Sequence, residues 1–281
     1  MPAAPTLALT GVTGHVGGRA ARELATSGLG LRLLARSPER VVALPGSVVL
    51  PLTYGNTAEA ASALAGVEVL LMVSAAENAD RRSQHLGLVD AAAAAGVEHI
   101  VYTSFLAAAP DATFTLGRDH WATEERIRAS GMRFTFLRDN LYADFFPDMA
   151  GPDGVIRGPA GEGAVSAVAR DDVARVAAAV LRDPAAHRDQ TYDLTGPEAL
   201  TLDEAAAVLS EVTGRAISFQ NESLPEAYAS RAVYQAPDWQ VEAWVSTYTA
   251  IASGELSRVT DHVQKLTGRE PLSLRALFGQ G

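Results

Sequence analysis

The chain has 281 residues, of which 48% are hydrophobic and 20% charged, values typical of a folded globular protein. Its net charge of −10 and the lack of a stripe of Lys and Arg argue against nucleic-acid binding. The absence of cysteine excludes disulfides, thiolate metal sites and a cysteine nucleophile. The six histidines never show an H-x-x-x-H spacing, so we expect no metal site.

Apolar runs are short throughout. The longest near the middle, 69–73 extended by Ser74-Ala75-Ala76, is far below the roughly 20 residues needed to cross a bilayer. The first residues contain no basic segment of the kind that opens a secretory signal. We therefore expect a cytoplasmic protein without a membrane span. The sequence leaves the oligomeric state open, and a homodimer is compatible with it.

In the first half of the chain, short apolar runs alternate with helical segments. Strands are expected at 6–10, 31–35, 48–52, 67–74, 97–104 and 132–137. Helices are expected at 19–27, 58–64, 80–95 and 118–129. This alternation predicts an α/β fold with a doubly wound, Rossmann-like parallel sheet and helices on both faces.

The rhythm breaks at Phe146-Pro147 and again at the turn residues of 151–154. We expect a nucleotide-binding domain over 1–146 and a smaller, helix-rich C-terminal domain over 147–281. Beyond the break, helices are expected at 171–181 and 202–212, and the pattern is mostly helical from Ile217 on. A strand near 191–195 is expected to return to the main sheet. Two capping boxes, Thr201 with Glu204 and Ser223 with Glu226, mark helix starts.

The stretch ALTGVTGHVGG places glycines at 11, 14 and 17 directly after the first strand. Glycines between a first strand and a first helix let the backbone approach a pyrophosphate, whose charge the helix N-terminus then meets. The ligand expected is a dinucleotide. The spacing is G-x-x-G-x-x-G rather than G-x-G-x-x-G, and the alternative is a plain strand-to-helix turn.

The second strand ends on Arg36 in LLARSPER, where NAD-binding proteins of this kind offer an acidic residue to the ribose hydroxyls. A guanidinium at this position can clamp a 2′-phosphate, with Ser37 close enough to help. The sequence therefore favours NADPH over NADH. The alternative is that Arg36 is a solvated strand end.

The chain has one lysine, Lys265, and the residue four positions before it is Asp261. A Tyr-x-x-x-Lys pair for carbonyl reduction and a Walker-type nucleotide loop are therefore excluded. On the helix after the fifth strand the sequence reads RDHWATEERIR. His120 and Glu124 share a helix face there, so His120 can present a titratable group to a substrate with Glu124 orienting it. The alternative is an exposed pair without a function.

Several stretches together resemble the NmrA-like branch of the atypical short-chain dehydrogenases. They are GVTGHVG, LLARSPER, the Tyr54-Gly55-Asn56 corner, VYTSFL, DHWATEERIR, FTFLRDNLYADFF and SGELSRVTDHVQKLTG. The resemblance covers essentially the whole chain. LRDNLYADFF and the late segment are similar, more specifically, to type 2 NADPH:quinone oxidoreductases and triphenylmethane-dye reductases.

The resemblance implies which residues contact NADPH. The glycine loop would line the pyrophosphate, Arg36 would meet the 2′-phosphate, Ser74 to Ala76 would border a ribose, and the segment after the sixth strand would flank the nicotinamide, with Arg170 reaching the cofactor. The implied set is Gly11, Val12, Thr13, Gly14, His15, Val16, Gly17, Arg36, Ser74, Ala75, Ala76, Leu137, Arg138, Asp139, Asn140, Leu141, Tyr142 and Arg170.

The sequence departs from the pattern of these reductases at two positions. Thr53 stands where an acidic residue is usual, and the usual Arg-Asn pair after the sixth strand is Arg138-Asp139. A negative charge at Asp139 near the nicotinamide would bear on the choice of substrate.

The sequence thus predicts an NADPH-dependent reductase that passes a hydride to a small-molecule acceptor, a quinone or a dye-like compound. Catalysis would rest on stacking the acceptor against the nicotinamide. Tyr142, His120 or water would supply a proton, and Tyr142, Phe145 and Phe146 would wall the pocket unless the two phenylalanines are ordinary core. The alternative is a non-catalytic NADP(H) sensor, which an exposed apolar patch around Trp239 and Trp244 would favour. A sugar-nucleotide epimerase is set aside because it needs the Tyr-Lys pair.

Overall fold

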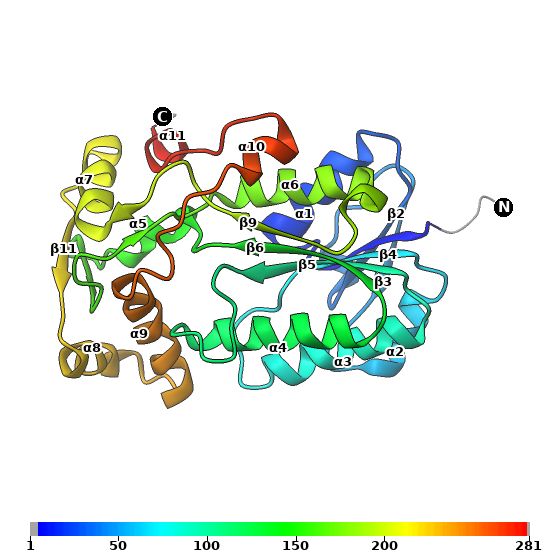
Figure 1. The fold of residues 1–281 in the computed structure, drawn as a ribbon, viewed down its shortest axis with the longest axis horizontal. Helices are drawn as coiled ribbons and strands as arrows, with labels where there is room; N and C mark the ends of the chain where they lie inside the picture. The colour runs from blue at the N-terminus through cyan, green and yellow to red at the C-terminus, as the bar shows by residue number, and fades with distance from the viewer. Residues whose placement is uncertain (1–4, 280–281) are drawn as a thin grey trace. The chain divides into compact units, whose positions relative to one another are not determined.

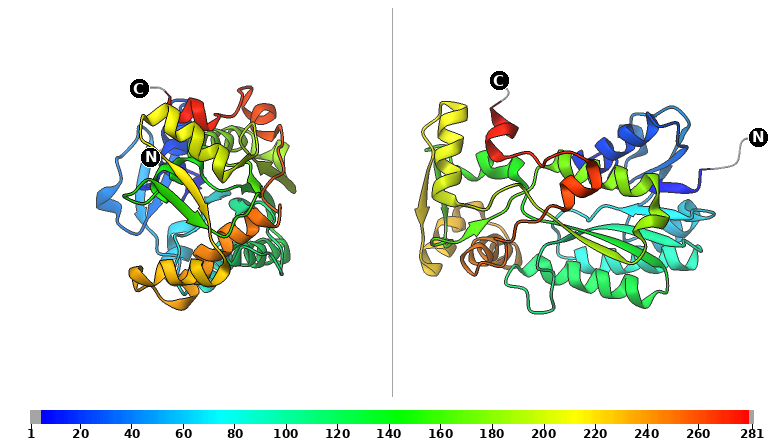
Figure 2. Two further views of the ribbon diagram at one scale, coloured as in Figure 1. Left: turned by 90° about the vertical axis from the view of Figure 1, so that its left-hand side faces the viewer. Right: turned by 45° about the horizontal axis from the view of Figure 1, so that its top comes forward.

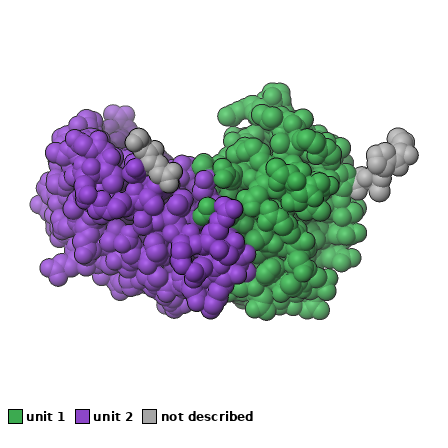
Figure 3. Space-filling view, turned by 90° about the horizontal axis from the view of Figure 1, so that it is seen from above, with its two compact units in different colours: residues 1–104, 119–138, 173–192 green, residues 105–118, 139–172, 193–281 purple. Residues whose placement is uncertain are grey.

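The computed structural model describes residues 5–279. The chain forms two compact units (Figure 3). Unit 1 contains residues 1–104, 119–138 and 173–192, and unit 2 contains residues 105–118, 139–172 and 193–281. The units therefore do not follow the expected division into 1–146 and 147–281. They interleave in the sequence because the main sheet takes its last strand, and most of the helix before it, from beyond residue 170.

Unit 1 is built on a seven-stranded sheet with the order β3-β2-β1-β4-β5-β6-β9. The strands are β1 (Leu7–Leu9), β2 (Leu31–Ala35), β3 (Ser47–Pro51), β4 (Val69–Met72), β5 (His99–Phe105), β6 (Arg133–Asp139) and β9 (Gln190–Leu194). The pairs β1 with β2, β1 with β4, β2 with β3 and β4 with β5 are parallel. This confirms the doubly wound fold, and β9 is the returning strand that the sequence predicted.

Helices cover both faces of this sheet (Figure 1). One face carries α1 (His15–Ala25) and α6 (Arg170–Arg182), and the other carries α2 (Thr57–Leu64), α3 (Arg81–Ala94) and α4 (Thr115–Ala129). Helix α1 begins four residues before its expected start, within the glycine motif itself.

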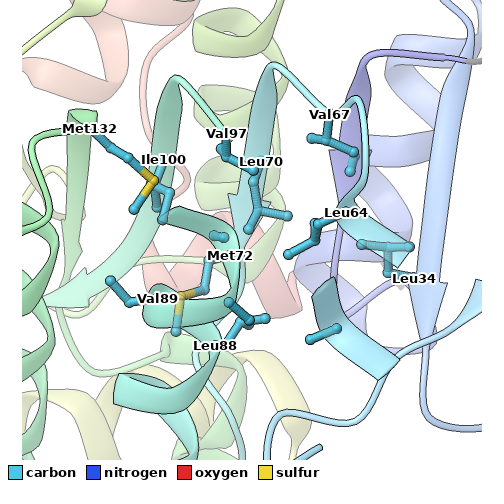
Figure 4. Close-up of a cluster of buried hydrophobic side chains, with 14 of the residues drawn as sticks. Leu34, Leu64, Val67, Leu70, Met72, Leu88, Val89, Val97, Ile100 and Met132 are labelled. Carbon is cyan, nitrogen blue, oxygen red and sulfur yellow. The ribbon is translucent and has the colours of Figure 1, made fainter. Parts of the chain in front are cut away.

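The apolar runs of the strands supply the core of unit 1. Leu34, Leu70, Met72 and Ile100 point from their strands towards Leu88 and its neighbours on the helices (Figure 4). Every residue of β5 is buried, as expected for a central strand covered on both faces.

Unit 2 combines two small sheets with helices. Strand β8 (Ala164–Val165) pairs antiparallel with β10 (Leu200–Thr201), and β7 (Val155–Gly158) pairs parallel with β11 (Ser218–Asn221). The helices are α5 (Phe146–Met149), α7 (Leu202–Thr213), α8 (Leu224–Arg231), α9 (Asp238–Ala252), α10 (His262–Thr267) and α11 (Leu274–Phe278) (Figure 2). Both capping boxes are confirmed, at the starts of α7 and α8.

The sequence did not predict β7, β8, β10 or β11. Each has two to four residues, too few for a period to show. Strand β11 also interrupts the region from Ile217 that was expected to be mostly helical, and its polar residues Ser218, Gln220 and Asn221 are ordered by pairing with β7. Among residues 5–279, no helix is long and apolar enough to cross a membrane.

Candidate cofactor-binding site

The glycine motif lies at the point of the sheet where the strand order reverses. From β1 the chain adds β2 and β3 on one side and then returns to place β4 on the other. In open α/β sheets, ligands bind outside the carboxyl ends of the strands at such a switch point. The loop that connects β1 to α1 leaves the sheet at this point.

Two of the glycines allow backbone segments to meet. Gly11 has φ +65°, and a Cβ there would lie 2.7 Å from the Cβ of Val73. A Cβ on Gly17 would lie 2.6 Å from the carbonyl oxygens of Thr10 and Gly11. Any side chain at these positions would therefore separate α1 and the loop from the sheet. Gly14 is extended, with φ −94°, and serves as the N-cap of α1.

The N-terminus of α1 is suited to an anion. No side chain caps it, and its first turn contains no acidic residue. The partial positive charge of the helix dipole and the first N–H groups are thus left for a ligand. These features fit the pyrophosphate of a dinucleotide, as the sequence predicted.

Arg36 follows β2 directly, on the side of β1 away from β4. Its side chain is exposed, and no protein group among the described residues pairs with its guanidinium. Arg32 in β2 donates to the carbonyls of Ala63 and Ala65, whereas the guanidinium of Arg36 makes no such hydrogen bond to a described residue. Its guanidinium is therefore available to a ligand.

A tyrosine ties the glycine loop to β4. The hydroxyl of Tyr54 donates to the carbonyl of Val73 at 2.5 Å and lies 2.6 Å from the hydroxyl of Thr10. Thr10 in turn accepts the N–H of Val73 at 2.9 Å. Burial raises the pKa of Tyr54 well above its usual value, so its hydrogen stays in place. The sequence shows the Tyr54 corner as one of the stretches that resemble the family, but it does not predict this contact.

The segment Ser74–Ala76 continues from β4 and is held by buried side chains. Ala75 donates its N–H to Nε2 of His85 at 2.9 Å and accepts Nε of Arg81 at 3.0 Å on its carbonyl. Ser74 donates its N–H to the hydroxyl of Thr103 at 2.8 Å. Sequence reasoning named the segment but missed Arg81 and His85, because nothing in their spacing marks them.

His120 lies in the interior of unit 1, with 5% of its surface exposed. Its Nε2 accepts from Arg81 at 2.8 Å, and its Nδ1 lies 2.9 Å from the hydroxyl of Tyr102. Burial, reinforced by the charge of Arg81, holds the pKa of His120 well below its usual value. A neutral, enclosed imidazole is poorly placed to give a proton to a substrate, so we reassign His120 from a catalytic to a positioning role.

Glu124 does not orient His120 as the helix spacing suggested. Its fully buried carboxylate accepts from Ser104 at 2.6 Å and from the guanidinium of Arg138 at 2.8 and 2.7 Å. Arg138, implied to flank the nicotinamide, thus neutralises a buried charge on α4. Leu137, also in the implied set, is fully buried in β6.

In unit 2, the segment after β6 carries a hydrogen-bonded carboxylate and phenol. Tyr142 donates its hydroxyl to Oδ2 of Asp139 at 2.6 Å, and Asp139 is 5% exposed. Burial first, and then the charge and hydrogen bond of Asp139, raise the pKa of Tyr142 well above 10. The phenol therefore keeps its proton and offers a lone pair to any ligand.

Other predicted residues of unit 2 divide between surface and interior. Arg170 pairs with Asp144 at 3.0 Å and lies 4.8 Å from the ring of Phe145, which is 47% exposed. Phe146, by contrast, is core at 2% exposed. Asn140 is buried as well, and its amide donates to the carbonyls of Ser166 and Leu256, so it anchors the late segment instead of facing solvent.

A cavity of about 660 Å³ opens at the opposite, amino edge of the unit 1 sheet. Glu68, Glu98, Arg133 and Arg188 surround it, with buried His99 at its floor. Its lining also includes Gly131 and the first residues of the 3-10 helix Pro184–His187. The switch-point rule, by contrast, favours the other edge for a dinucleotide. Within residues 5–279, no group of three or more His, Asp or Glu residues could hold a metal ion.

Known proteins are similar to this chain over nearly its whole length. Residues 11–184 match a family model described as NAD(P)H-binding. Quinone oxidoreductase 2 of Escherichia coli is 32% identical over 275 residues, which are 95% of this chain and 96% of that protein. Its crystal structure with NADPH has a TM-score of 0.87 and covers 96% of this chain and 97% of that chain.

Two further reductases are similar over most of their length. The (4-alkanoyl-5-oxo-2,5-dihydrofuran-3-yl)methyl phosphate reductase of Streptomyces griseus is 36% identical over 268 residues, covering 93% of this chain and 92% of that protein. The crystal structure of Citrobacter triphenylmethane reductase with NADP(H) is 33% identical with a TM-score of 0.85, covering 96% of this chain and 98% of that chain.

Proposed function

The chain belongs to the NAD(P)H-binding, NmrA-like family of oxidoreductases, and from this we propose that it transfers a hydride from NADPH to a quinone or a similar conjugated acceptor. The observation that carries the proposal is the likeness of the whole chain to quinone oxidoreductase 2, together with a glycine cradle at the switch point of the sheet and an exposed Arg36 after the neighbouring strand β2.

The two phosphate-bearing parts of the cofactor have suitable partners in unit 1. We assign the pyrophosphate to the loop of Gly11, Gly14 and Gly17 and to the N-terminus of α1, and the 2′-phosphate to Arg36. When bound, NADPH supplies the hydride. The role of the protein is to hold the cofactor and orient it towards the acceptor.

The acceptor fits a site without a strong acid. A hydride brings two electrons and one proton to the quinone. The reduced quinone needs one further proton to become a hydroquinone. The single lysine, Lys265, is exposed and paired with Asp261 at 2.9 Å, so it activates no tyrosine. We assign the second proton to solvent, because Tyr142 gives its hydrogen to Asp139 and His120 is enclosed.

The unit 2 residues are proposed to bind the acceptor through shape and polarity. Phe145 offers an exposed ring, and the phenol oxygen of Tyr142 can accept a hydrogen bond. Arg170, held by Asp144, adds a fixed positive charge beside that ring. An electron-poor ring can stack on the electron-rich ring of Phe145, and the carbonyl oxygens of a quinone can accept hydrogen bonds from a guanidinium.

The sensor alternative would be favoured by an exposed apolar patch around Trp239 and Trp244. Both tryptophans are half-buried, but Val233 is 75% exposed, and Tyr234, which packs edge-on against Trp244 at 5.7 Å, is 67% exposed. The reductase is the function we propose because the whole chain is similar to quinone oxidoreductase 2.

The test is the loss of NADPH absorbance at 340 nm with the purified protein and 1,4-benzoquinone, beside NADH and beside a triphenylmethane dye. We expect saturable oxidation of NADPH well above the enzyme-free rate, with one hydroquinone formed per NADPH. Because a hydride carries both electrons at once, superoxide dismutase should not change the rate at which added cytochrome c is reduced. Tight NADP(H) binding without turnover of either acceptor would contradict the proposal and favour a sensor.

A further inference from the structure

A buried polar network lies beneath the segment Ser74–Ala76 in unit 1. It comprises Arg81, His85, Tyr102, Asp119, His120 and Thr123. Arg81, His85, Tyr102, His120 and Thr123 are each no more than 5% exposed. A network of this kind is costly to bury unless its members are paired, and here each is.

Ala75 is the point at which the network reaches the backbone. Both of its main-chain polar groups are taken, the N–H by His85 and the carbonyl by Arg81. Arg81 is itself fixed by Asp119 at 3.3 Å and by His120 at 2.8 Å. The segment after β4 is therefore held rigidly from below by α3 and α4.

The hydrogen bonds also define which ring nitrogen of His85 and of His120 carries the proton. His85 Nε2 accepts from Ala75, so the ring proton is on Nδ1, facing Thr123 and Tyr102. His120 Nε2 accepts from Arg81, so its proton is on Nδ1, facing Tyr102. Both imidazoles are neutral, and burial lowers the pKa of His85 to about 3.

The position of this segment fixes which part of the cofactor it serves. With the pyrophosphate on the glycine loop after β1 and the 2′-phosphate on Arg36 after β2, the other half of the dinucleotide extends to the far side of β1. The neighbour on that side is β4, and Ser74–Ala76 follows it. The segment thus lies on the nicotinamide side of the switch point.

We propose that His85 and Arg81 are positioning residues, which hold Ala75 so that the segment after β4 orders the nicotinamide riboside half of NADPH but not its adenosine half. Neither residue touches the cofactor. The proposal rests on NADPH as the cofactor and is independent of the identity of the acceptor.

The test compares two ligands by calorimetry. NADPH reaches both sides of the switch point, whereas adenosine 2′,5′-bisphosphate reaches only Arg36 and the glycine loop. In His85→Ala the N–H of Ala75 loses its acceptor, so the segment is no longer held in its binding conformation before NADPH arrives. If that conformation falls to about a tenth of the free protein, the dissociation constant of NADPH rises about tenfold. The affinity for the bisphosphate should stay within about twofold. In His85→Gln the amide oxygen can accept the same N–H, and NADPH binding should recover in part.

The matched control is His99→Ala. His99 is also buried, at 3% exposed, and bonds the hydroxyl of Thr135 at 2.9 Å, but it begins β5 at the amino edge of the same sheet. We expect this variant to bind both ligands as the wild type does. Equal weakening of both ligands in His85→Ala would show general loosening of unit 1 and overturn the proposal, as would unchanged NADPH binding.

Should His85→Ala fail to fold, Arg81→Gln provides the same comparison, because it removes the Nε–H that the carbonyl of Ala75 accepts. Selective loss of NADPH affinity supports the proposal, and parallel loss or no loss overturns it. No acceptor is present in these titrations, so they do not depend on turnover. If the wild type oxidises no NADPH but the variants lose NADPH affinity selectively, the proposed reductase function fails and this inference stands.

Discussion

At the scale of single residues, neighbours decide what a side chain can offer. Tyr142 and His120 are both titratable groups that the sequence marks as proton donors. The structure gives the proton of Tyr142 to Asp139 and encloses His120 between Arg81 and Tyr102. Arg36, which is exposed, differs from Arg32 in β2, whose guanidinium donates to the carbonyls of Ala63 and Ala65.

Replacing Asp139 by Asn tests the state of Tyr142. The substitution removes a buried negative charge beside the phenol, so the pKa of Tyr142 should fall towards 10, although burial still raises it. Phenolate absorbance at 295 nm reports this titration, with Asp139→Asn/Tyr142→Phe as the blank. A titration of Tyr142 that begins at the same pH in the wild type and in Asp139→Asn, after subtraction of the blank, would show that Asp139 has no such influence.

Replacing Arg36 by Glu tests the 2′-phosphate contact. Charge-assisted hydrogen bonds contribute about 1.5–3 kcal/mol, so NADPH affinity should fall roughly 10- to 100-fold while NADH affinity holds or rises. Arg40→Glu is the matched control, because Arg40 is an exposed arginine in the same β2–β3 connection and changes the net charge equally. An equal loss of NADPH affinity in both variants would mean that the cofactor is attracted by the overall charge of this surface and not by a contact with Arg36.

At the scale of elements, the contact between α1 and the glycine loop decides whether a cradle exists. Gly17 lies on the first turn of α1, against the backbone of Thr10 and Gly11. Gly14 is extended, and a Cβ there would meet only the carbonyl oxygen of Gly11 at 3.3 Å. The two glycines of one motif therefore tolerate substitution very differently.

Gly17→Ala should lower the free energy of unfolding by about 1–3 kcal/mol, because the methyl group must push α1 from the backbone below it. NADPH binding should be lost with it, since the helix N-terminus moves from the loop. Urea unfolding and calorimetry measure the two effects. Gly14→Ala is the control and should be affected less in both. Similar losses in the two variants would contradict the backbone contact as the cause.

At the scale of the whole molecule, buried neutral histidines make stability depend on pH. His85, His99 and His120 have pKa values held below 6.5 mainly by burial, to about 3 for His85 and about 4 for His99. In the unfolded chain they bind protons near pH 6.5. The unfolded state therefore binds more protons below that pH, and the folded state loses stability as the pH falls.

The free energy of unfolding should accordingly fall between pH 6.5 and pH 4, by up to about 1.4 kcal/mol per pH unit for each such histidine. Urea unfolding at pH 7, 6 and 5 measures the slope. His99→Gln removes one titrating group, so its slope should be shallower than that of the wild type by at most this amount. Parallel slopes in the two proteins would show that His99 titrates alike in both states.

The sequence by itself determined the fold class, the cofactor and the family. Apolar runs of fixed period, glycines at 11, 14 and 17 and an arginine after the second strand are local signals, because each follows from the chemistry of neighbouring residues. The model match over 11–184 and the likeness to quinone oxidoreductase 2 agree with them. The missing Tyr-Lys pair followed from a single lysine.

Only the tertiary structure decided how the two units divide the chain and what many of the polar side chains do. Four short strands acquire order from partners 35 to 63 residues away, which no local pattern encodes. Glu124 meets Arg138, Asn140 meets Leu256, and His85 with Arg81 meets Ala75. Burial and hydrogen bonding are properties of residues brought together by folding, so a spacing in the sequence can nominate a titratable group but cannot say whether its proton is free.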